Sequence, residues 1–332
     1  MGKIRLGQIG IGHNHGEGKM RAARKFPDLF EIVGVCEPQA EWRKERGYWP
    51  SYQGLPFLTE DELLANCDAV LVETDVPHLT PTAARCLAAG KHIHMDKPAG
   101  GSYEQFAELL KTAERQNLQV QMGYMYRYNP AVRKCLDLIR NGELGEIMMI
   151  NAEMSTFHPA PYKQWLSQFK GGIMYILGSH LVDLIVYLLG EPRGITSFLN
   201  HSSCDGLDFP DNNLAVLDYG KALAKITVSS VEVNGWGRRQ LVVAGTRGTV
   251  EIKPLENRTR MTWSDLEIAS TPYEDMKKEI PVEDVDKLCR YDTMMREFYD
   301  LINGRATTPF TRAHDLAVHK VLADVCQGYN FI

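Results

Sequence analysis

The chain has 332 residues, of which 44% are hydrophobic and 24% are charged, and its formal net charge at pH 7 is −5. Domains usually hold about 100–200 residues, so this length predicts two of them. The negative charge and the lack of a basic run argue against a nucleic-acid partner. We expect a cytoplasmic protein without a membrane partner, because no segment approaches ~18 uninterrupted apolar residues and the first residues lack the pattern of a secretory leader. Seven scattered cysteines without a CxxC pair favour reduced thiols over disulfides or a zinc site.

The first stretch of the chain has the pattern of a dinucleotide-binding site. An apolar strand over residues 4–9 leads into Gly10, which permits a tight turn. Gly12 then lets a pyrophosphate approach backbone N–H groups at the start of a helix expected over 16–26. The third glycine of Gly-x-Gly-x-x-Gly would fall at position 15, which is a histidine, and Gly16 comes one residue late. The candidate cofactor-binding residues of this turn are Gly10, Ile11, Gly12, His13, Asn14 and His15.

An acidic residue ends the second predicted strand, over residues 31–37. Glu37 lies about twenty residues beyond the glycines, where a carboxylate accepts hydrogen bonds from the adenosine ribose and repels a 2′-phosphate. No arginine is adjacent to receive such a phosphate. The sequence therefore predicts NAD in preference to NADP; the alternative is that Glu37 is a surface acid beside a structural turn.

Strands and helices alternate up to about residue 125, which predicts a doubly wound parallel sheet. Helices are expected over 40–47, after an N-cap at Thr59, and over 80–89 and 102–116; buried strands are expected over 69–74, 91–95 and 118–122. Ligands of such sheets bind at the carboxyl edge, so the residues that end these strands are candidates for the cofactor site. They are Thr74, Asp75, His78, Asp96 and Lys97.

Lys97 is also the lysine whose position suggests catalysis. It directly precedes Pro98, which forces an extended or turn geometry and permits a cis peptide bond. Beside a nicotinamide, a lysine can donate to a substrate oxygen and, as a cation, lower the pKa of a neighbouring acid–base group. The alternative is a solvated loop lysine.

Residues 126–332 are predicted to form a second domain. We expect a helix capped by Asn129, a strand over 147–154, further strands between 194 and 267, and closing helices over 282–302 and 312–328. Adjacent hairpins predict a mostly antiparallel sheet with one face covered by helices and the other free.

Two features of this second half are candidates for binding a substrate. The segment with His158, Tyr162 and Trp165 offers aromatic faces that suit the C–H faces of a sugar, although packing beneath a long loop explains them equally well. On the helix that begins after Gly171, His180 and Asp183 are three residues apart and share a face. From the residues alone, His180 is either a satisfied core histidine or a catalyst.

The order of these motifs resembles the Gfo/Idh/MocA family of two-domain dehydrogenases, named after glucose–fructose oxidoreductase, inositol dehydrogenase and MocA. The resemblance rests on the glycine turn with Glu37, on residues 88–98, whose Asp96-Lys97-Pro98 corresponds to the family's Glu-Lys-Pro signature, on residues 126–130, and on the segment from Gly171 to Asp183. It implies an α/β fold with a Rossmann domain over 1–125 and, over 126–332, an α/β domain with a large, mostly antiparallel open sheet.

The same resemblance implies NAD(P)-dependent chemistry on a sugar, inositol or related polyol, with His180 as the acid–base group assisted by Lys97. It also implies a homodimer or homotetramer formed through the open sheet face. The candidate substrate-binding residues are Asp183, His158, Tyr162, Trp165 and Tyr126.

The chain departs from the family at Ile176, four residues before His180. The family has an aspartate there, which helps to set the orientation and pKa of the histidine, and isoleucine can do neither. Three classes of function therefore stay open: a sugar or polyol dehydrogenase, which is favoured; an NAD-using glycoside hydrolase or lyase with transient oxidation; and a non-catalytic NAD-binding protein.

No metal site is predicted. One residue separates His13 from His15, and one separates His92 from His94. Alternate positions of a strand point to opposite faces, and neither pair has a carboxylate or cysteine cluster nearby in the sequence to complete it.

Overall fold

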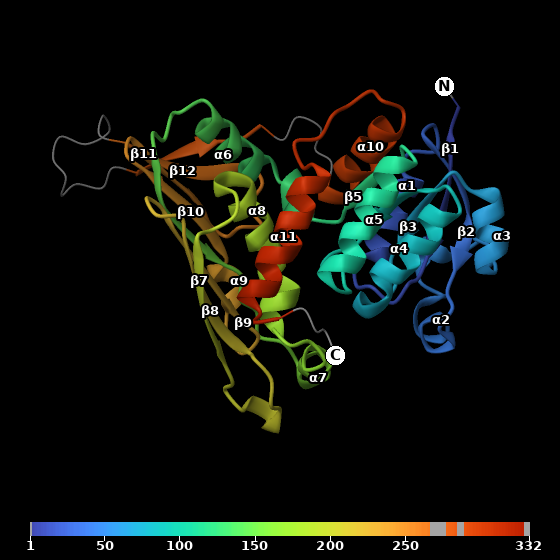
Figure 1. The fold of residues 1–332 in the computed structure, drawn as a ribbon, viewed down its shortest axis with the longest axis horizontal. Helices are drawn as coiled ribbons and strands as arrows, with labels where there is room; N and C mark the ends of the chain where they lie inside the picture. The colour runs from blue at the N-terminus through green and yellow to red at the C-terminus, as the bar shows by residue number, and fades with distance from the viewer. Residues whose placement is uncertain (1, 266–276, 284–288, 329–332) are drawn as a thin grey trace. The chain divides into compact units, whose positions relative to one another are not determined.

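The computed structural model describes residues 2–265, 277–283 and 289–328 (Figure 1). The end of the strand region expected up to residue 267 and part of the helix expected from residue 282 lie outside the described residues. The chain divides into two compact units, Met1–Met125 with Leu288–Leu316, and Tyr126–Lys287 with Ala317–Ile332.

The first unit contains the predicted parallel sheet. Its five strands are β1 (Ile4–Ile9), β2 (Phe30–Cys36), β3 (Ala69–Val72), β4 (His92–Met95) and β5 (Val120–Met122), in the order β2-β1-β3-β4-β5. All neighbouring pairs of these strands are parallel. Phe57 forms an isolated parallel bridge with Val35 of β2. The order reverses between β1 and β3, where doubly wound sheets bind their ligands at the carboxyl ends of the strands. The predicted Rossmann fold is confirmed.

Five described helices of this unit begin within one residue of the predicted positions, whereas the helix expected from residue 282 begins at Arg290. The helices are α1 (Gly16–Arg24), α2 (Ala40–Arg46), α3 (Glu60–Asn66), α4 (Leu79–Ala88), α5 (Tyr103–Arg115) and α10 (Arg290–Ile302), with short turns η1 (Pro50–Tyr52) and η2 (Val76–His78). Thr59 before α3 and Ser102 before α5 each form a capping box. Such a box satisfies helical N–H groups that have no partner within the helix.

The second unit is built on an eight-stranded sheet. Its strands are β6 (Ile147–Glu153), β7 (Gly194–Asn200), β8 (Asn212–Asp218), β9 (Leu223–Ser229), β10 (Gln240–Gly245), β11 (Gly248–Ile252), β12 (Arg260–Asp265) and β13 (Lys277–Pro281), in the order β13-β12-β11-β10-β6-β9-β8-β7. Among the strands that the structure describes, β6 and β9 pair in parallel and the other neighbouring pairs are antiparallel. The mostly antiparallel open sheet is therefore confirmed.

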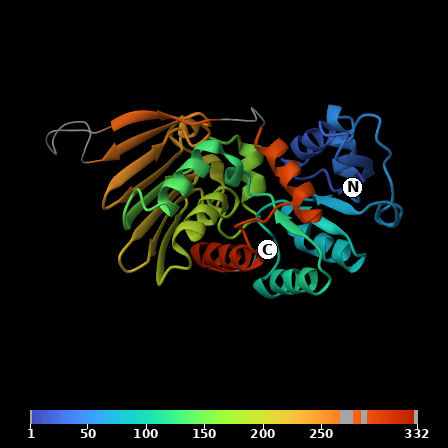
Figure 2. The same cartoon turned by 90° about the horizontal axis from the view of Figure 1, so that it is seen from above.

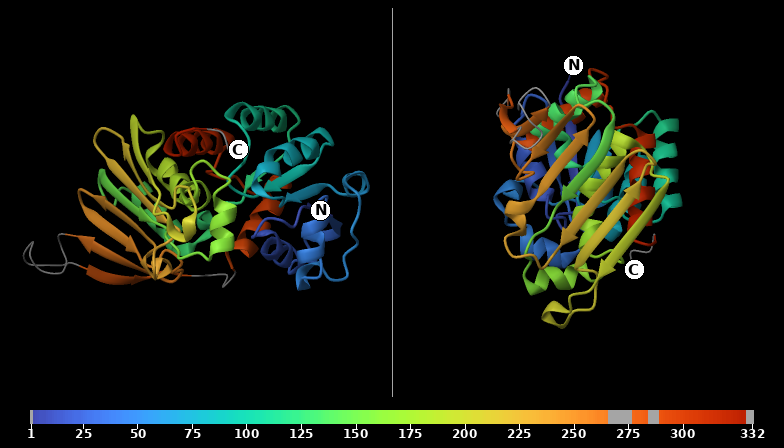
Figure 3. Two further views of the ribbon diagram at one scale, coloured as in Figure 1. Left: turned by 90° about the horizontal axis from the view of Figure 1, so that it is seen from below. Right: turned by 90° about the vertical axis from the view of Figure 1, so that its left-hand side faces the viewer.

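Helices cover one face of this sheet (Figure 2). They include η3 (Met125–Tyr128), α6 (Pro130–Arg140), α7 (Ala160–Leu166), η4 (Met174–Gly178), α8 (Ser179–Leu189) and α11 (Arg312–Val325), while η5 (Cys204–Gly206) and α9 (Gly235–Arg238) are short turns between strands. Helix α8 contacts β6 and β9, and its residues from Ser179 to Val186 are all buried. The right-hand view of Figure 3 looks onto the opposite face, where strands lie in front of the helices.

The predicted domain from 126 to 332 included the closing helices. In the structure α10 groups with the first unit, and α11 passes from the first unit to the second between Leu316 and Ala317. Within the described part of the chain, no helix combines the length and apolar character that crossing a bilayer requires.

Candidate functional site: a glycine turn, a buried charge cluster and a histidine helix

The glycine turn has the geometry that its sequence predicts. Gly10 has a φ of +88°, and a Cβ placed there would lie 2.3 Å from the backbone nitrogen of Thr74, so only glycine fits. Gly16 supplies the close approach of helix to strand, because a Cβ there would lie 3.1 Å from the Cβ of Glu73. The displaced third glycine therefore still brings α1 against the end of β3.

Glu37 holds this turn from the end of β2. Its Oε2 accepts a hydrogen bond from the N–H of Ile11 at 2.6 Å, and its Oε1 accepts one from the N–H of Gln39 at 2.8 Å. Burial raises the pKa of the Glu37 carboxyl, and these two N–H donors oppose the rise. These contacts give Glu37 a structural role in the turn, and its hydrogen bonds to a ribose stay a prediction.

Arg46 from α2 is a part of the turn that the sequence did not reveal. Its Nη1 donates to the carbonyl oxygens of Ile11 at 3.2 Å and Gly12 at 2.8 Å, and its guanidinium lies over the rings of Trp42 and Trp49. The prediction that no arginine is adjacent to Glu37 is correct for its sequence neighbours, but the fold brings Arg46 to the same turn. The sequence did contain one signal for this contact, since Arg46 follows Glu37, the candidate ribose-binding acid, by nine residues and lies in a short helix.

The turn leaves polar groups for a ligand. The N–H groups of Gly12 and Asn14 have no hydrogen-bond partner among the described residues, nor has the buried hydroxyl of Thr74 at the end of β3. Asp75, next in the chain, accepts from Gln39 at 3.1 Å, and its Oδ1 lies 2.7 Å from Nδ1 of the exposed His78. These groups lie at the carboxyl edge of the sheet, as predicted.

A fully buried charge cluster lies next to the turn. Nζ of Lys19, from α1, is 2.5 Å from Oδ2 of Asp96 and 2.9 Å from Oε1 of Glu73, and none of the three side chains is exposed. Burial opposes ionisation of Asp96, yet His13 and Lys19 hold the pKa of this carboxyl well below its usual value. Burial raises the pKa of Glu73 well above its usual value despite Lys19. Of the two carboxyl groups, Asp96 is therefore the one that is ionised, and Glu73 is the one that binds a proton more readily.

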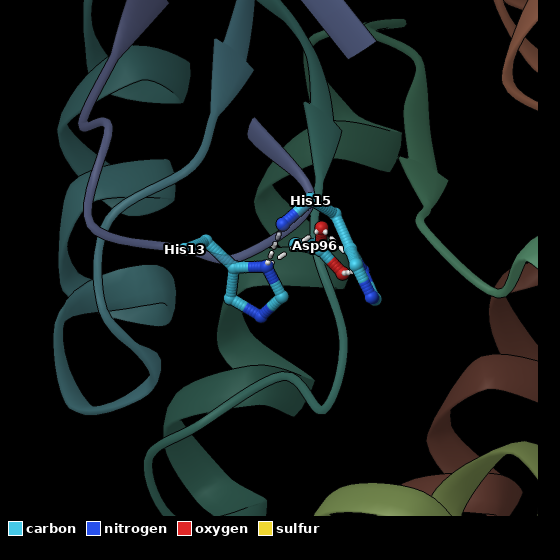
Figure 4. A group of neighbouring side chains, drawn as sticks. All are labelled: His13, His15 and Asp96. Carbon is cyan, nitrogen blue, oxygen red and sulfur yellow. Dashed lines mark hydrogen bonds and ion pairs between the residues drawn. The ribbon is translucent and has the colours of Figure 1, made fainter. Parts of the chain in front are cut away.

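Two histidines of the turn converge on Asp96 (Figure 4). Nδ1 of His13 lies 3.0 Å from Oδ2 of Asp96, and Nδ1 of His15 lies 3.2 Å from the same oxygen. Burial lowers the pKa of His15 to about 4 although Asp96 opposes the shift. The reasoning that these histidines point to opposite faces and lack a carboxylate was wrong. They lie after β1, with His15 in a helical conformation, and the carboxylate comes from β4.

Lys97 follows Asp96 directly. Its N–H donates to Oδ1 of Asp96 at 2.6 Å, its side chain is buried, and the peptide bond to Pro98 is cis. The alternative of a solvated loop lysine is therefore wrong. What its amine does in catalysis stays a prediction.

In the second unit, His180 lies on α8 one residue after its start. Its ring packs edge-on against Tyr126, with the ring centroids 4.9 Å apart. The preceding turn, η4, is a π-helix, which is frequent at functional sites. Ile176, which the sequence analysis aligned with the family's aspartate, is buried within this π-turn.

Asp183 is tied to Arg127. The guanidinium donates from Nε at 3.0 Å and from Nη2 at 2.5 Å to the carboxylate, and both side chains are buried. A second polar chain runs from Tyr126, whose hydroxyl donates to Glu256 at 2.8 Å, to Arg239, which donates to the same oxygen at 2.8 Å. The sequence analysis predicted neither the Arg127–Asp183 pair nor the Arg239–Glu256 pair, because the two residues of each pair are 56 and 17 positions apart in the chain.

The predicted aromatic residues stack on one another. The rings of His158 and Tyr162 lie 4.2 Å apart in a stacked arrangement, and Tyr162 lies 5.2 Å from Trp165. Burial lowers the pKa of His158 to about 4, with help from Arg239 and Lys163. Nε2 of His158 is buried without a hydrogen-bond partner among the described residues. This neutral ring therefore has an unused polar atom, which a ligand hydroxyl can satisfy.

Comparison with known proteins assigns both halves of the chain. The family model described as "Oxidoreductase family, NAD-binding Rossmann fold" matches residues 4–124, and the model described as "GFO/IDH/MocA C-terminal domain" matches residues 132–251. The two matches correspond to the parallel sheet and to much of the open sheet.

Curated relatives and solved structures agree with these matches. An uncharacterized oxidoreductase of Schizosaccharomyces pombe is 27% identical over 68% of this chain and 64% of its own length. Glucose-6-phosphate 3-dehydrogenase of Bacillus subtilis is 29% identical over 60% of each chain. The aligned part of this chain thus spans about three fifths of the length of these relatives. The WlbA dehydrogenase of Bordetella pertussis, solved with NADH and UDP-GlcNAcA, has a TM-score of 0.80 and 18% identity, covering 99% of this chain and 96% of that one.

Proposed function

The chain belongs to the Gfo/Idh/MocA family of oxidoreductases, and we propose that it is a dehydrogenase that transfers a hydride between NAD and a hydroxyl or carbonyl group of a sugar, inositol or related polyol. The observation that carries the proposal is the glycine turn, whose unpaired N–H groups lie beside the Glu37 carboxylate at the edge of a parallel sheet. The dehydrogenase activity named for the Bacillus subtilis relative supports the reaction class.

The chain's own residues fit a dinucleotide. The N–H groups of Gly12 and Asn14 suit diphosphate oxygens, and the buried Thr74 hydroxyl lacks a partner among the described residues. When bound, the nicotinamide ring accepts or supplies the hydride. The protein's part is to hold the dinucleotide through the turn and to manage the proton of the reacting hydroxyl.

Selectivity for NAD over NADP rests on Glu37. Its carboxylate repels a 2′-phosphate, and Arg46 is already engaged by the carbonyl oxygens of the turn. Binding isotherms for both cofactors test this, with Glu31→Gln on the same strand as the control. We expect Glu37→Gln to reduce the preference for NAD. Tighter binding of NADP by the unchanged protein would show instead that Arg46 receives the phosphate.

We assign the acid–base role to His180 and a supporting role to Lys97. Both side chains are buried, as is common for groups with tuned pKa values. Lys97→Met and His180→Ala should each lower kcat by about 10²-fold or more while sparing NAD affinity, and Lys111→Ala on α5 serves as the control. Full activity in His180→Ala would transfer the role to His158 or Tyr162.

Ile176→Asp tests the departure from the family. A carboxylate beside the imidazole favours its protonated form, so the pKa of His180 should rise and the acidic limb of the kcat profile should move to higher pH. An unchanged profile would show that position 176 does not act on His180.

Substrate binding is assigned to the second unit. The stacked rings of His158 and Tyr162 and the tilted ring of Trp165 form an aromatic group that suits a sugar face, and Nε2 of His158, which has no partner among the described residues, suits a hydroxyl. Tyr126 and Asp183 act through Glu256 and Arg127 respectively, so we assign them to positioning. Trp165→Ala should raise KM more than it lowers kcat.

The assay is NADH formation at 340 nm with a panel of sugars, sugar phosphates and inositols. Turnover supports the dehydrogenase. Glycoside cleavage with bound NAD but no net NADH would support the hydrolase or lyase, which Ile176 makes a specific alternative. NAD binding without either reaction would support a cofactor-binding protein.

The open sheet face is the proposed interface of a homodimer or homotetramer. Phe198 and Leu223 are 53% and 41% exposed on strands whose outward positions also include Leu214, the cross-strand neighbour of Phe198. Exposed apolar groups of this kind mark interaction surfaces. Light scattering should show an oligomer that Phe198→Glu dissociates, while Lys225→Glu on the same face does so less. A monomeric unchanged protein would refute the interface.

A further inference from the structure

We propose that His13, His15 and Asp96 form a binding site for one divalent transition-metal ion, with Zn²⁺ as the probe. The inference goes beyond the proposed dehydrogenase and does not depend on it. The three potential ligand atoms, two imidazole Nδ1 atoms and a carboxylate oxygen, all lie within 4.8 Å of one another. Figure 4 shows the two rings and the carboxylate directed toward the same point.

The spacing fits a shared ion. Zn–N bonds of about 2.0–2.1 Å and Zn–O bonds of about 2.0–2.2 Å place neighbouring ligand atoms of a tetrahedral site roughly 3.3–3.4 Å apart. The separations from Oδ2 of Asp96 are 3.0 Å to His13 and 3.2 Å to His15. Both of these separations are within a few tenths of an ångström of the value for a shared ion.

Hydrogen bonding alone satisfies this arrangement poorly. Nδ1 of His13 and the Lys19 ammonium, at 2.5 Å, approach Oδ2 of Asp96, whereas Nδ1 of His15 lies 3.3 Å from Oδ1, which also accepts from the N–H of Lys97. Nδ1 of His13 also lies 3.3 Å from the N–H of His15, and one tautomer cannot both donate to Asp96 and accept from that N–H. A metal ion would use the ring lone pairs instead.

The surroundings supply a second shell. The N–H of Lys97 donates to Oδ1 of Asp96, and Lys19 holds Oδ2, so the carboxylate is fixed in its ligating orientation. The Lys19 charge also repels a cation, which predicts weaker binding than at a four-ligand structural site. Two histidines and one carboxylate leave coordination positions open, as in catalytic zinc and non-haem iron sites.

The place of the site suggests what the ion does. His13 and His15 belong to the glycine turn, and Asp96 ends β4, so an ion would link two loops of the sheet edge. The N–H groups of Gly12 and Asn14 in the same turn have no partner among the described residues and can donate to an anionic oxygen. The ion would therefore stabilise the turn and add positive charge for an anionic ligand.

Titration of the full chain with ZnCl₂, after removal of metal with a chelator, tests the proposal without any dinucleotide. We expect close to one equivalent bound and a visible absorption band when Co²⁺ replaces Zn²⁺. His13→Gln and His15→Gln should each weaken binding by ~10-fold or more. His201→Ala, which removes a histidine paired with Asp208 in the second unit, should leave it unchanged.

Circular dichroism checks that each variant folds. Failure of the unchanged protein to bind Zn²⁺ would overturn the proposal, as would equal binding by the folded His13→Gln, His15→Gln double variant. Neither result bears on the dehydrogenase, which is assayed by NADH formation.

Discussion

Replacing Lys19 by methionine would leave two carboxylates buried without their shared ammonium. Methionine nearly matches the length of lysine, so the substitution changes the charge with little change in packing. Glu73 and Asp96 are fully buried, and Nζ lies 2.9 and 2.5 Å from them. Removal of one member of a buried ion pair costs about 3–5 kcal/mol, which is a factor of roughly 10²–10⁴ in the ratio of folded to unfolded protein.

The loss should depend on pH with a definite sign. Burial already raises the pKa of Glu73, and loss of Lys19 raises it further. A carboxyl whose pKa is higher in the folded state stabilises the fold below its unfolded pKa and ceases to do so as pH rises through the folded pKa. The penalty of Lys19→Met should therefore be larger at pH 8 than at pH 5.

Urea denaturation at the two pH values measures this difference. Arg5→Met is the matched control, because it breaks a partly exposed pair with Asp68, and solvent screening makes such a pair contribute little to stability. A loss for Lys19→Met no larger than that of the control, or one equal at both pH values, would refute the assignment of the cluster as a buried, charge-coupled unit.

Three further outcomes follow from the geometry. Gly10→Ala should abolish NAD binding and lower stability by at least about 1 kcal/mol, because a Cβ would meet the Thr74 backbone at φ +88°; wild-type affinity by calorimetry would contradict this. Asp183→Asn should cost about 3 kcal/mol in urea denaturation by leaving the buried Arg127 without its counter-charge; a loss below 1 kcal/mol would mean that water solvates the arginine. Arg46→Met should weaken NAD binding about tenfold through loss of its two carbonyl contacts, whereas Arg43→Met, on the same helix, should not.

Local signals explain why so much of the fold could be predicted. Thr59 and Asn129 were expected as caps, and each accepts a hydrogen bond from the first turn of its helix. The strands ending near Cys36, Val72 and Met95 were recognisable as short apolar runs between helices. A cap or a buried parallel strand depends on residues adjacent in the chain, so one sequence suffices to find it.

The site was less predictable because its contacts are distant in sequence. His15 meets Asp96 across 81 residues, and Arg46 reaches Gly12 across 34. The histidines were assigned strand alternation, whereas the strand ends at Ile9 and the chain turns before them. The π-turn before His180 has no local signature beyond its glycines, and it changes the helical periodicity that counting four residues back from His180 assumes.

Two departures from the family pattern meet in this structure. His15 stands where the third glycine is usual, and Asp96 stands where the family signature has glutamate. Their side chains lie 3.2 Å apart, which suggests that the shorter carboxylate is compensated by the longer side chain at the turn.

Compensation of this kind is measurable as a coupling energy. His15→Gly alone removes a contact of Asp96, and Asp96→Glu alone forces an extra methylene into a fully buried position, so each should destabilise the protein. Together they restore the family pattern, and the double variant should be more stable than the sum of the two losses by about 0.5–3 kcal/mol. Urea denaturation of the four proteins in the presence of a chelator gives this value. Additivity within about 0.5 kcal/mol would show that the two positions changed independently, and that His15 does not depend on the length of the side chain at position 96.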